Sequence, residues 1–262
     1  MKRLNGFGVG IPPQLVRREG AWIVEQEFDL LGPRPFLNWS SDPICERDGF
    51  VFAPMVWGAN SSEQRTIERL DQHPGETWLL WNEPERPEQA NIAPEVAAEL
   101  TRDFLRLAWG VGREFQWAAP GVWLGPDSND GLEWATVYAR NLRRRGISRP
   151  TYWHIHAYRS PSRQRFFESI ARWHEWYQVW GAGAPVIMSE VCAETSEYDD
   201  QVAVMDEVAA LLRNGTLTAA FWFSSHVSDT SQWHNAALCS VDVAAQTVAL
   251  KPLGQHFVGL GV

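Results

Sequence analysis

Residues 76–84 read Glu-Thr-Trp-Leu-Leu-Trp-Asn-Glu-Pro, the pattern of a buried strand that ends abruptly in polar residues. The four consecutive apolar residues at 78–81 are typical of a strand that is covered on both faces. Pro84 cannot donate a hydrogen bond to a sheet, so we expect the strand to end before it. In parallel α/β folds, ligands bind at the carboxyl ends of the strands. Asn82 and Glu83 are therefore candidate site residues.

Outward from this strand, the chain alternates between apolar strand patterns and amphipathic helix patterns. Predicted strands begin near residues 4, 34, 50, 76, 116, 151, 184 and 219, and from the fourth onward about 35 residues separate successive starts. This spacing is the length of one βα unit, and eight such units close into a barrel. Only about ten polar residues separate the second and third strands, which leaves no room for a full helix. We expect a compact (β/α)8 TIM barrel of the α/β class.

The remaining patterns support one barrel without a linker, so we expect residues 1–262 to form a single domain. An open, doubly wound sheet is the alternative, but it commonly carries a Gly-rich phosphate turn, and the sequence has no GxGxxG motif. Helix patterns cover residues 14–31, 61–72, 94–109, 130–145, 163–180 and 198–213, and a hairpin at 238–250 precedes a last helix.

Composition excludes several classes of partner. The net charge of −9 disfavours nucleic acid and anionic membrane surfaces. Hydrophobic residues make up 45% and charged residues 21%, which is an ordinary globular balance. The 15 tryptophans are unusual, and although we expect most of them in the core, indole faces also stack on sugar rings. We expect a monomer that binds neither nucleic acid nor membranes.

The cysteines and the first residues of the sequence indicate in which cellular compartments the protein could reside. Cys45, Cys192 and Cys239 are widely spaced and odd in number, so they fit neither a disulfide framework nor a zinc site. The first residues are basic but no apolar segment follows them, so we expect these residues not to be a signal peptide. We expect a protein that is either cytoplasmic or secreted with its signal already removed.

A second carboxylate lies at the end of another predicted strand. Residues 184–191 read Ala-Pro-Val-Ile-Met-Ser-Glu-Val, in which a buried apolar run meets Glu190. Since an unpaired carboxylate is costly to bury, this position indicates a function rather than a structural need. Glu83 and Glu190 would then lie on the same rim of the barrel. The alternative for either residue is a surface position in a loop.

The strand predicted over 151–158 supplies polar and aromatic neighbours. Strand alternation places four side chains on one face: Tyr152, His154, His156 and Tyr158. We expect His156 and Tyr158, near the carboxyl end, to lie beside Glu190, where a phenol can donate to the ionised carboxylate. His154 is deeper, and we favour a core position for it. The His-x-His pair also suggests a metal, but no third ligand stands at a useful spacing.

Two tryptophans end predicted strands, and a third lies within one. Trp39 ends the second strand, Trp57 ends the third, and Trp222 lies within the eighth, residues 219–225. We expect Trp222 to expose an indole face to the cleft. Trp39 and Trp57 could line the cleft, and they could equally pack at its rim.

The two strand ends resemble the acid/base and nucleophile strands of clan A retaining glycoside hydrolases, which use two carboxyl groups about 5 Å apart. A narrower resemblance rests on six motifs: Phe-Leu-Asn-Trp at 36–39, Ala-Pro-Met-Val-Trp-Gly at 53–58, Trp-Asn-Glu-Pro at 81–84, His-x-Tyr at 156–158, Ser-Glu at 189–190 and Phe-Trp-Phe at 221–223. Together they are similar to glycoside hydrolase family 128, which comprises compact clan A barrels acting as β-1,3-glucanases. The chain differs at Ala157, where that family commonly has a bulky aromatic residue, and after Glu190.

This resemblance implies a glycoside hydrolase catalytic domain that cleaves a β-1,3-glucan internally, with Glu83 as acid/base and Glu190 as nucleophile. It implies that the substrate-binding residues are Asn82, His156, Tyr158 and Trp222, with Asn82 bonded to the substrate 2-hydroxyl. The partner would be an oligo- or polysaccharide, with no cofactor and no metal. Four alternatives remain: specificity for xylan or mannan, a transglycosylase, a non-catalytic carbohydrate-binding barrel, and a metal-dependent hydrolase that uses His154 and His156.

Overall fold

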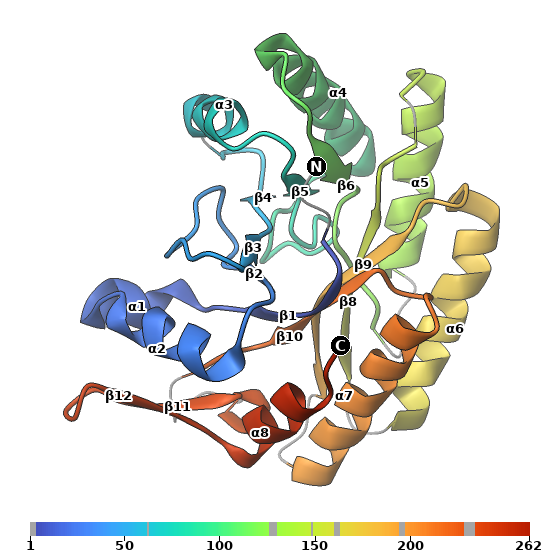
Figure 1. Ribbon diagram of the computed structural model, residues 1–262. Helices are drawn as coiled ribbons and strands as arrows, with labels where there is room; N and C mark the ends of the chain where they lie inside the picture. Colours follow the sequence, from blue (N-terminus) through green and yellow to red (C-terminus); the bar gives the residue numbers. More distant parts are fainter. Residues whose placement is uncertain are drawn as a thin grey trace.

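Parallel strands form a central ring in this protein, and helices surround it (Figure 1). The computed structural model describes residues 4–61, 63–125, 130–147, 149–159, 163–193, 197–227 and 234–262. The side chains of Tyr158, Arg159, Arg163 and His234 lie outside that description. The alternation of strands and helices is that of a (β/α)8 barrel, which confirms the predicted fold class.

The barrel wall is parallel throughout, and β1 pairs with β10 to join its first and last strands. Its members are β1 (Gly6–Gly10), β2 (Pro35–Leu37), β3 (Val51–Phe52), β4 (Met55–Val56), β5 (Thr77–Leu80), β6 (Gln116–Ala118), β7 (Val122–Trp123), β8 (Trp153–Arg159), β9 (Val186–Ala193) and β10 (Ala219–Phe223). Apart from the wall, β11 (Cys239–Asp242) and β12 (Thr247–Leu250) form an antiparallel hairpin.

Proline interrupts two of the wall strands. β3 pairs with β2 whereas β4 pairs with β5, and only Ala53 and Pro54 separate the two segments. In the same way Pro120 lies between β6, which pairs with β5, and β7, which pairs with β8. The sequence analysis predicted one strand from near residue 50 to Trp57 and another that begins near residue 116, with no interruption in either, but a proline has no N–H to give to a ladder. Isolated bridges at Asn82–Gly121 and Ala118–Tyr152 keep the ring continuous.

The helices cover the outside of the ring. They are α1 (Pro13–Glu19), α2 (Trp22–Leu31), α3 (Glu63–Gln72), α4 (Pro94–Val111), α5 (Asp130–Arg144), α6 (Arg163–Trp180), α7 (Tyr198–Arg213), the 3-10 turn η1 (His234–Ala236) and α8 (Pro252–Gly259). The single helix predicted over 14–31 is wrong, because Gly20 breaks it with φ of 116°, a conformation that L side chains rarely adopt. As predicted, no helix separates β2 from β3.

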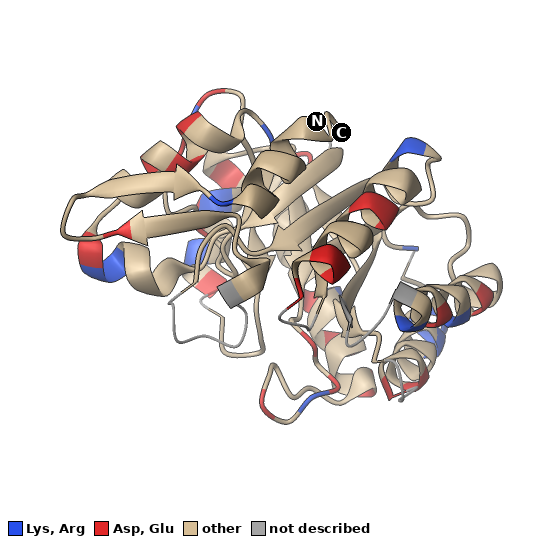
Figure 2. Ribbon diagram, turned by 90° about the horizontal axis from the view of Figure 1, so that it is seen from below, with Lys and Arg blue, Asp and Glu red and all other residues tan. Residues whose placement is uncertain are grey.

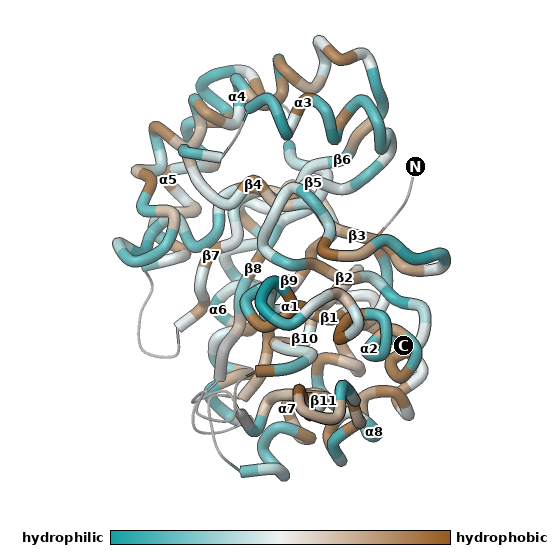
Figure 3. The backbone as a smooth tube through the Cα atoms, turned by 90° about the vertical axis from the view of Figure 1, so that its left-hand side faces the viewer, coloured by the Kyte–Doolittle hydropathy of each residue, from teal (hydrophilic) through white to brown (hydrophobic). Residues whose placement is uncertain are grey.

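Two apolar layers result from strand alternation. The layer inside the ring holds small and medium side chains with a few aromatics, namely Leu4, Leu37, Ala53, Met55, Leu79, Ala118, Tyr152, Ile187, Ala219 and Phe221. The larger layer lies between the strands and the helices and includes Trp78, Trp222 and Phe7. Figure 3 shows the corresponding hydropathy along the chain, with hydrophilic residues concentrated on the helices. Which layer a residue joins therefore depends on its register in the strand.

Charged residues lie mainly on the helices and connecting turns, while the strands are almost free of them (Figure 2). The two ends of the described chain are adjacent, since the backbone N–H of Phe7 donates to the carbonyl of Val262. The hairpin is tied to α2 because the Gln26 side chain bonds the backbone of Gln246 and Val248. Within the described residues, no helix has the length and apolar character needed to cross a bilayer.

Candidate active site

Glu83 lies just beyond β5 in an unusual backbone conformation. Trp81 has φ of 43° and Glu83 has φ of 40°, left-handed values that residues other than glycine rarely adopt. The outward indole of Trp81 donates to Thr101 Oγ1, and the N–H of Glu83 donates to the carbonyl of Gly121. Such conformations persist only where the surroundings hold them, and they concentrate at functional sites.

Glu190 owes its orientation to an extra residue in β9. Ile155 of β8 pairs with Met188, but the next residue, His156, pairs with Glu190, so Ser189 is a bulge. The pairing with β10 shows the same extra residue. Without it, alternation would send Ser189 into the barrel and Glu190 outward, whereas the bulge turns both inward. Contrary to the sequence prediction, Glu190 does not end the strand, which continues to Ala193.

The two glutamates and one histidine form a buried trio. Nδ1 of His156 lies 2.9 Å from Oε1 of Glu83 and 3.6 Å from Oε1 of Glu190. One atom from each residue, a ring nitrogen or a carboxylate oxygen, lies within 4.8 Å of the other two. An oxygen of Glu83 and an oxygen of Glu190 therefore approach to within that distance. Retaining glycosidases separate their carboxyl groups by about 5 Å and inverting ones by about 6.5–9.5 Å. The trio therefore has the spacing of a retaining pair.

Trp39 contacts Glu190 directly. Its indole Nε1 donates to Oε1 of Glu190 over 2.6 Å, although 151 positions separate the two residues. The ring also meets Phe223 edge-on, with 5.5 Å between centroids. It fits because position 10 is a glycine, where a Cβ would come within 2.8 Å of the indole. The residue suspected of lining the cleft is thus a hydrogen-bond donor to a candidate nucleophile.

Neighbouring carboxylates raise the pKa of His156. Burial is the largest influence and by itself would lower the pKa of this imidazole. The opposing effects outweigh it: the charge of Glu190, the hydrogen bond and charge of Glu83, and the charge of Glu85. His156 therefore favours the protonated form, in which Nδ1 can donate toward both members of the pair.

His154 belongs to the core. Burial lowers its pKa well below the usual value, so the imidazole is neutral. Nδ1 lies 3.2 Å from the carbonyl of Ala119 and Nε2 contacts Ser189 Oγ, so both nitrogens are occupied. This does not support a metal site shared by His154 and His156. Among the residues that the structure describes, the one group of His, Cys and acidic side chains close enough for a cation is Glu83, His156 and Glu190.

Asn82 has an acceptor to offer. The side chain is buried, and its Nδ2 donates to Oε1 of Gln89 over 3.1 Å. Its Oδ1 has no hydrogen-bond partner within the described chain. Because Gln89 accepts from the amide N–H, Oδ1 is the atom of this side chain that is left without a partner among the described residues. Gln89, which orients this amide, was not identified from the sequence.

Trp222 is not in the cleft, which corrects the prediction. Its side chain is fully buried in the outer layer, where Nε1 donates to the carbonyl of Ala236 and the ring packs edge-on against Phe7. The reason is alternation, since Phe221 points into the barrel and Trp222 therefore points away from it. Phe223 takes the inward position beside Trp39. The period of two in Phe-Trp-Phe could have predicted this, given the register.

The predictions for Trp57 and Tyr158 as substrate-binding residues have different outcomes. Trp57 follows β4 and is 36% exposed, and it has the parity of Met55, which points into the barrel. Its carbonyl accepts the N–H of Asn82, so it lies at the rim beside that residue. Its contact with substrate stays a prediction. Tyr158 is in β8, but the prediction concerns its side chain, which lies outside the described residues.

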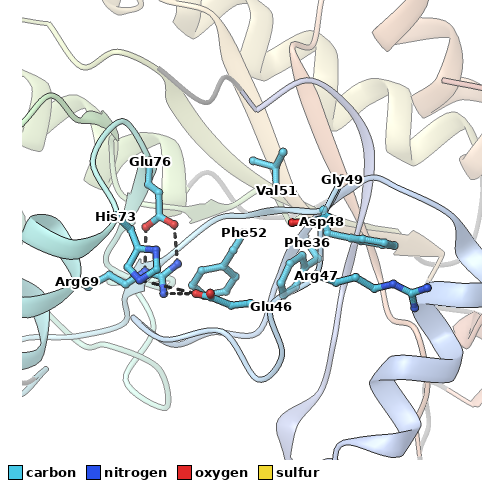
Figure 4. A pocket seen from close by; sticks show the side chains of 11 residues that line it. Phe36, Glu46, Arg47, Asp48, Gly49, Val51, Phe52, Arg69, His73 and Glu76 are labelled. Atoms are coloured by element: carbon cyan, nitrogen blue, oxygen red, sulfur yellow. Dashed lines mark hydrogen bonds and ion pairs between the residues drawn. The ribbon is translucent and has the colours of Figure 1, made fainter.

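A separate pocket opens at the amino ends of the strands. Its volume is about 630 Å³, and Figure 4 shows Arg69, His73 and Glu76 pointing toward one another inside it. Arg69 donates to both oxygens of Glu76 and to Glu46, so the buried charges are paired. None of the trio lines this pocket. We interpret it as a structural ion network rather than a site of chemistry.

The fold and the paired carboxylates define a glycoside hydrolase barrel, and comparison agrees. The sequence model of the glycosyl hydrolase catalytic core matches residues 36–257, so the chain belongs to that family. No curated protein matches its sequence significantly.

Solved structures of family 128 enzymes share the fold over nearly the whole chain. An endo-β-1,3-glucanase of subgroup I from Amycolatopsis mediterranei, in complex with laminaritriose, has a TM-score of 0.72 and 21% identity, covering 97% of this chain and 99% of its own. A subgroup II endo-β-1,3-glucanase from Sorangium cellulosum has a TM-score of 0.72 at 20% identity, covering 97% and 98%. A subgroup VI exo-β-1,3-glucanase from Aureobasidium namibiae has a TM-score of 0.73 at 19% identity, covering 97% and 96%.

Proposed function

We propose that this protein is a family 128 retaining β-1,3-glucanase that cleaves internal linkages of a β-glucan, with Glu83 as acid/base and Glu190 as nucleophile. The observation that carries the proposal is the approach of the two carboxylates to within 4.8 Å, with His156 between them. The likeness to laminari-oligosaccharide complexes supports the choice of substrate. Two buried carboxylates at retaining distance favour an enzyme over a carbohydrate-binding barrel.

In the first step, an oxygen of Glu190 attacks the anomeric carbon while protonated Glu83 gives its proton to the glycosidic oxygen. The bond between the anomeric carbon and that oxygen breaks, and the leaving sugar departs with the proton. The indole N–H of Trp39 holds Glu190 in place and favours its ionised form, since hydrogen bonds to a charged group are strong. A glycosyl ester on Glu190 results.

In the second step, Glu83 takes a proton from water, whose oxygen attacks the anomeric carbon and frees Glu190. Each proton that Glu83 gives in the first step is thereby regained. Asn82 Oδ1 would accept a hydrogen bond from the 2-hydroxyl of the substrate, and this bond strengthens as positive charge develops on the sugar ring. Trp57 and Tyr158 are proposed substrate contacts from their positions at the rim. The scheme needs neither a metal nor a cofactor.

Product analysis on a polysaccharide panel tests the proposal. We expect laminarin to yield a ladder of oligosaccharides, with slower action on lichenan and none on xylan or mannan. Release of glucose alone would indicate exo action, as in the subgroup VI relative. Glu190→Ala is the control for contaminating activity, and a chelator should leave the rate unchanged. Hydrolysis of xylan or mannan in preference to laminarin would contradict the substrate, and no hydrolysis of any polymer would contradict the enzyme.

A further inference from the structure

A third carboxylate, Glu85, is fixed beside the trio. The N–H of Arg86 donates to the carbonyl of Glu83 over 3.0 Å and closes a tight turn around Pro84. Oε1 of Glu85 accepts the backbone N–H of Trp123 over 2.6 Å. Trp123 in β7 is the register partner of His156 in β8. Glu85 therefore ties the turn that carries Glu83 to the strand that neighbours His156.

Two buried polar atoms on this side of the trio have no partner. Oε2 of Glu85 and Nε2 of His156 are both inaccessible and lack a hydrogen bond from the described residues. Gly121 is what leaves space at Nε2, because a Cβ at that position would lie 2.6 Å from it. A buried polar atom without a partner costs stability, so a structural role alone gives no reason to keep a carboxylate here.

The groups that shift the pKa of the Glu85 carboxyl come from its own turn, from β7 and from β8. Burial is the main cause that raises the pKa of Glu85, from 4.5 to about 7, and the charge of Glu83 adds to it. The backbone N–H groups of Trp123 and of Glu85 itself, and then the charge of His156, oppose the increase. Arg86, 3.7 Å from Oε2 of Glu83 and stacked on the Trp123 ring, is partly neutralised by exposed Glu88. Around His156, the charged or titratable neighbours are Glu83, Glu85, Glu190 and His154.

We propose, building on the proposed function, that Glu85 is a positioning residue that anchors the Glu83 turn to β7 and, as a third negative charge, keeps a proton on His156, the imidazole that lies between Glu83 and Glu190. The charges of Glu190 and Glu83 and the hydrogen bond to Glu83 all favour the protonated form of the His156 imidazole that lies between them. When the pH rises through about 7, Glu85 itself ionises. The new negative charge on Glu85 raises the pKa of His156 further, so the imidazole loses its proton less readily. The site thus keeps the proton needed for leaving-group departure at a higher pH than the trio alone would.

Glu85→Gln separates the charge from the anchor. The amide oxygen can still accept the Trp123 N–H, while the charge is lost. We expect the alkaline limb of the kcat/KM profile on laminarin to move about one pH unit lower, so that activity falls about tenfold above that limb. Glu85→Ala should show the same shift and an additional loss at every pH. Glu114→Gln removes an exposed carboxylate just before β6, at the opposite end of the barrel, and should leave the profile where it is.

Titration of the His156 imidazole by NMR makes the test independent of turnover. The His156 signal is assigned by its absence in His156→Gln, and its midpoint should be lower in Glu85→Gln than in the parent protein. An unchanged midpoint overturns the proposal, as does a Glu85→Gln profile that matches the parent or falls equally at every pH. If the parent protein hydrolyses no glucan while the midpoint shifts, the proposed function fails and the coupling between Glu85 and His156 stands.

Discussion

The two ends of this barrel both bury charge, but they treat it differently. At the amino end, Arg69 donates Nε and Nη2 to Glu76 over 3.0 and 2.5 Å and Nη1 to Glu46 over 2.9 Å. At the carboxyl end, carboxylates outnumber cations around the trio, and the buried polar atoms without a partner among the described residues include Asn82 Oδ1, Glu85 Oε2 and His156 Nε2. One end is a closed set of matched charges, and the other holds buried polar groups that the described residues leave unsatisfied.

This difference separates stability from chemistry. Paired and fully hydrogen-bonded charges can be buried at tolerable cost, but removing one partner strands the other. Each unpartnered buried polar atom costs about 1–3 kcal/mol, which a site recovers only when substrate binds or charge develops. We therefore expect substitutions at the amino end to change folding and those at the carboxyl end to change catalysis.

The largest effect is expected from Glu190→Gly. Turnover of laminarin should fall by about 10⁴-fold or more, because no covalent intermediate can form. With an activated β-glycosyl donor, azide should restore turnover and give a glycosyl azide of inverted configuration. A variant that keeps substantial activity on the polymer would refute the assigned nucleophile.

Glu83→Ala should be less severe and should give the opposite stereochemistry. Hydrolysis of the polymer should fall by about 10²–10⁴-fold, because the leaving oxygen lacks an acid. An aryl leaving group needs no acid, so glycosylation should survive and azide should release a product of retained configuration. Mass spectrometry of the trapped enzyme and NMR of the product measure both. Exchanged configurations between the two variants would exchange the two roles.

At the amino end, Arg69→Met should act on folding alone. Glu76, left buried and unpaired, should lower the free energy of unfolding by about 3–5 kcal/mol. The double variant Arg69→Met with Glu76→Gln should regain much of that loss, since no charge remains stranded. Urea unfolding measures it, and kcat per folded molecule should match the parent protein. A fall in kcat with normal stability would show that the pocket in Figure 4 has a functional role.

Two tryptophans sharpen the comparison within the barrel. Trp39→Phe removes the N–H that donates to Glu190, so kcat/KM should fall by about 10–100-fold, the value of a hydrogen bond to a charge. Trp222→Phe removes an N–H that donates to Ala236 in the outer layer, so it should lower the free energy of unfolding by about 1–3 kcal/mol. Kinetics and urea unfolding of both variants measure these two effects. If Trp222→Phe lowered kcat/KM and left the free energy of unfolding unchanged, Trp222 would be a substrate contact after all.

The last prediction concerns the pH dependence of stability at Glu85. Its pKa is raised from 4.5 to about 7, so between these values the folded protein binds more protons than the unfolded chain. Stability from this group is therefore present at low pH and is lost as pH rises toward 7, by up to about 3 kcal/mol. Glu85→Gln should unfold at a higher temperature than the parent protein at pH 8 and show a flatter dependence. Equal slopes would refute this.

Local patterns were enough to predict the barrel. Helices over 163–180 and 198–213 have the predicted bounds, since each is set by its own apolar periodicity and flanking residues. The missing helix between β2 and β3 followed from the length of that segment. The prediction of a single helix over 14–31 was wrong because a hydrophobic pattern does not reveal the backbone conformation of Gly20.

The sequence by itself determined the barrel, the two strands that carry Glu83 and Glu190, and the rim on which they meet, because periodicity and spacing are local properties. Only the tertiary structure decided which way the side chains point. The Ser189 bulge turns Glu190 inward, β10 alternation buries Trp222, and Trp39 reaches Glu190 across 151 positions. Register and bulges arise from pairing with neighbouring strands, and a one-residue slip moves a side chain to the other face.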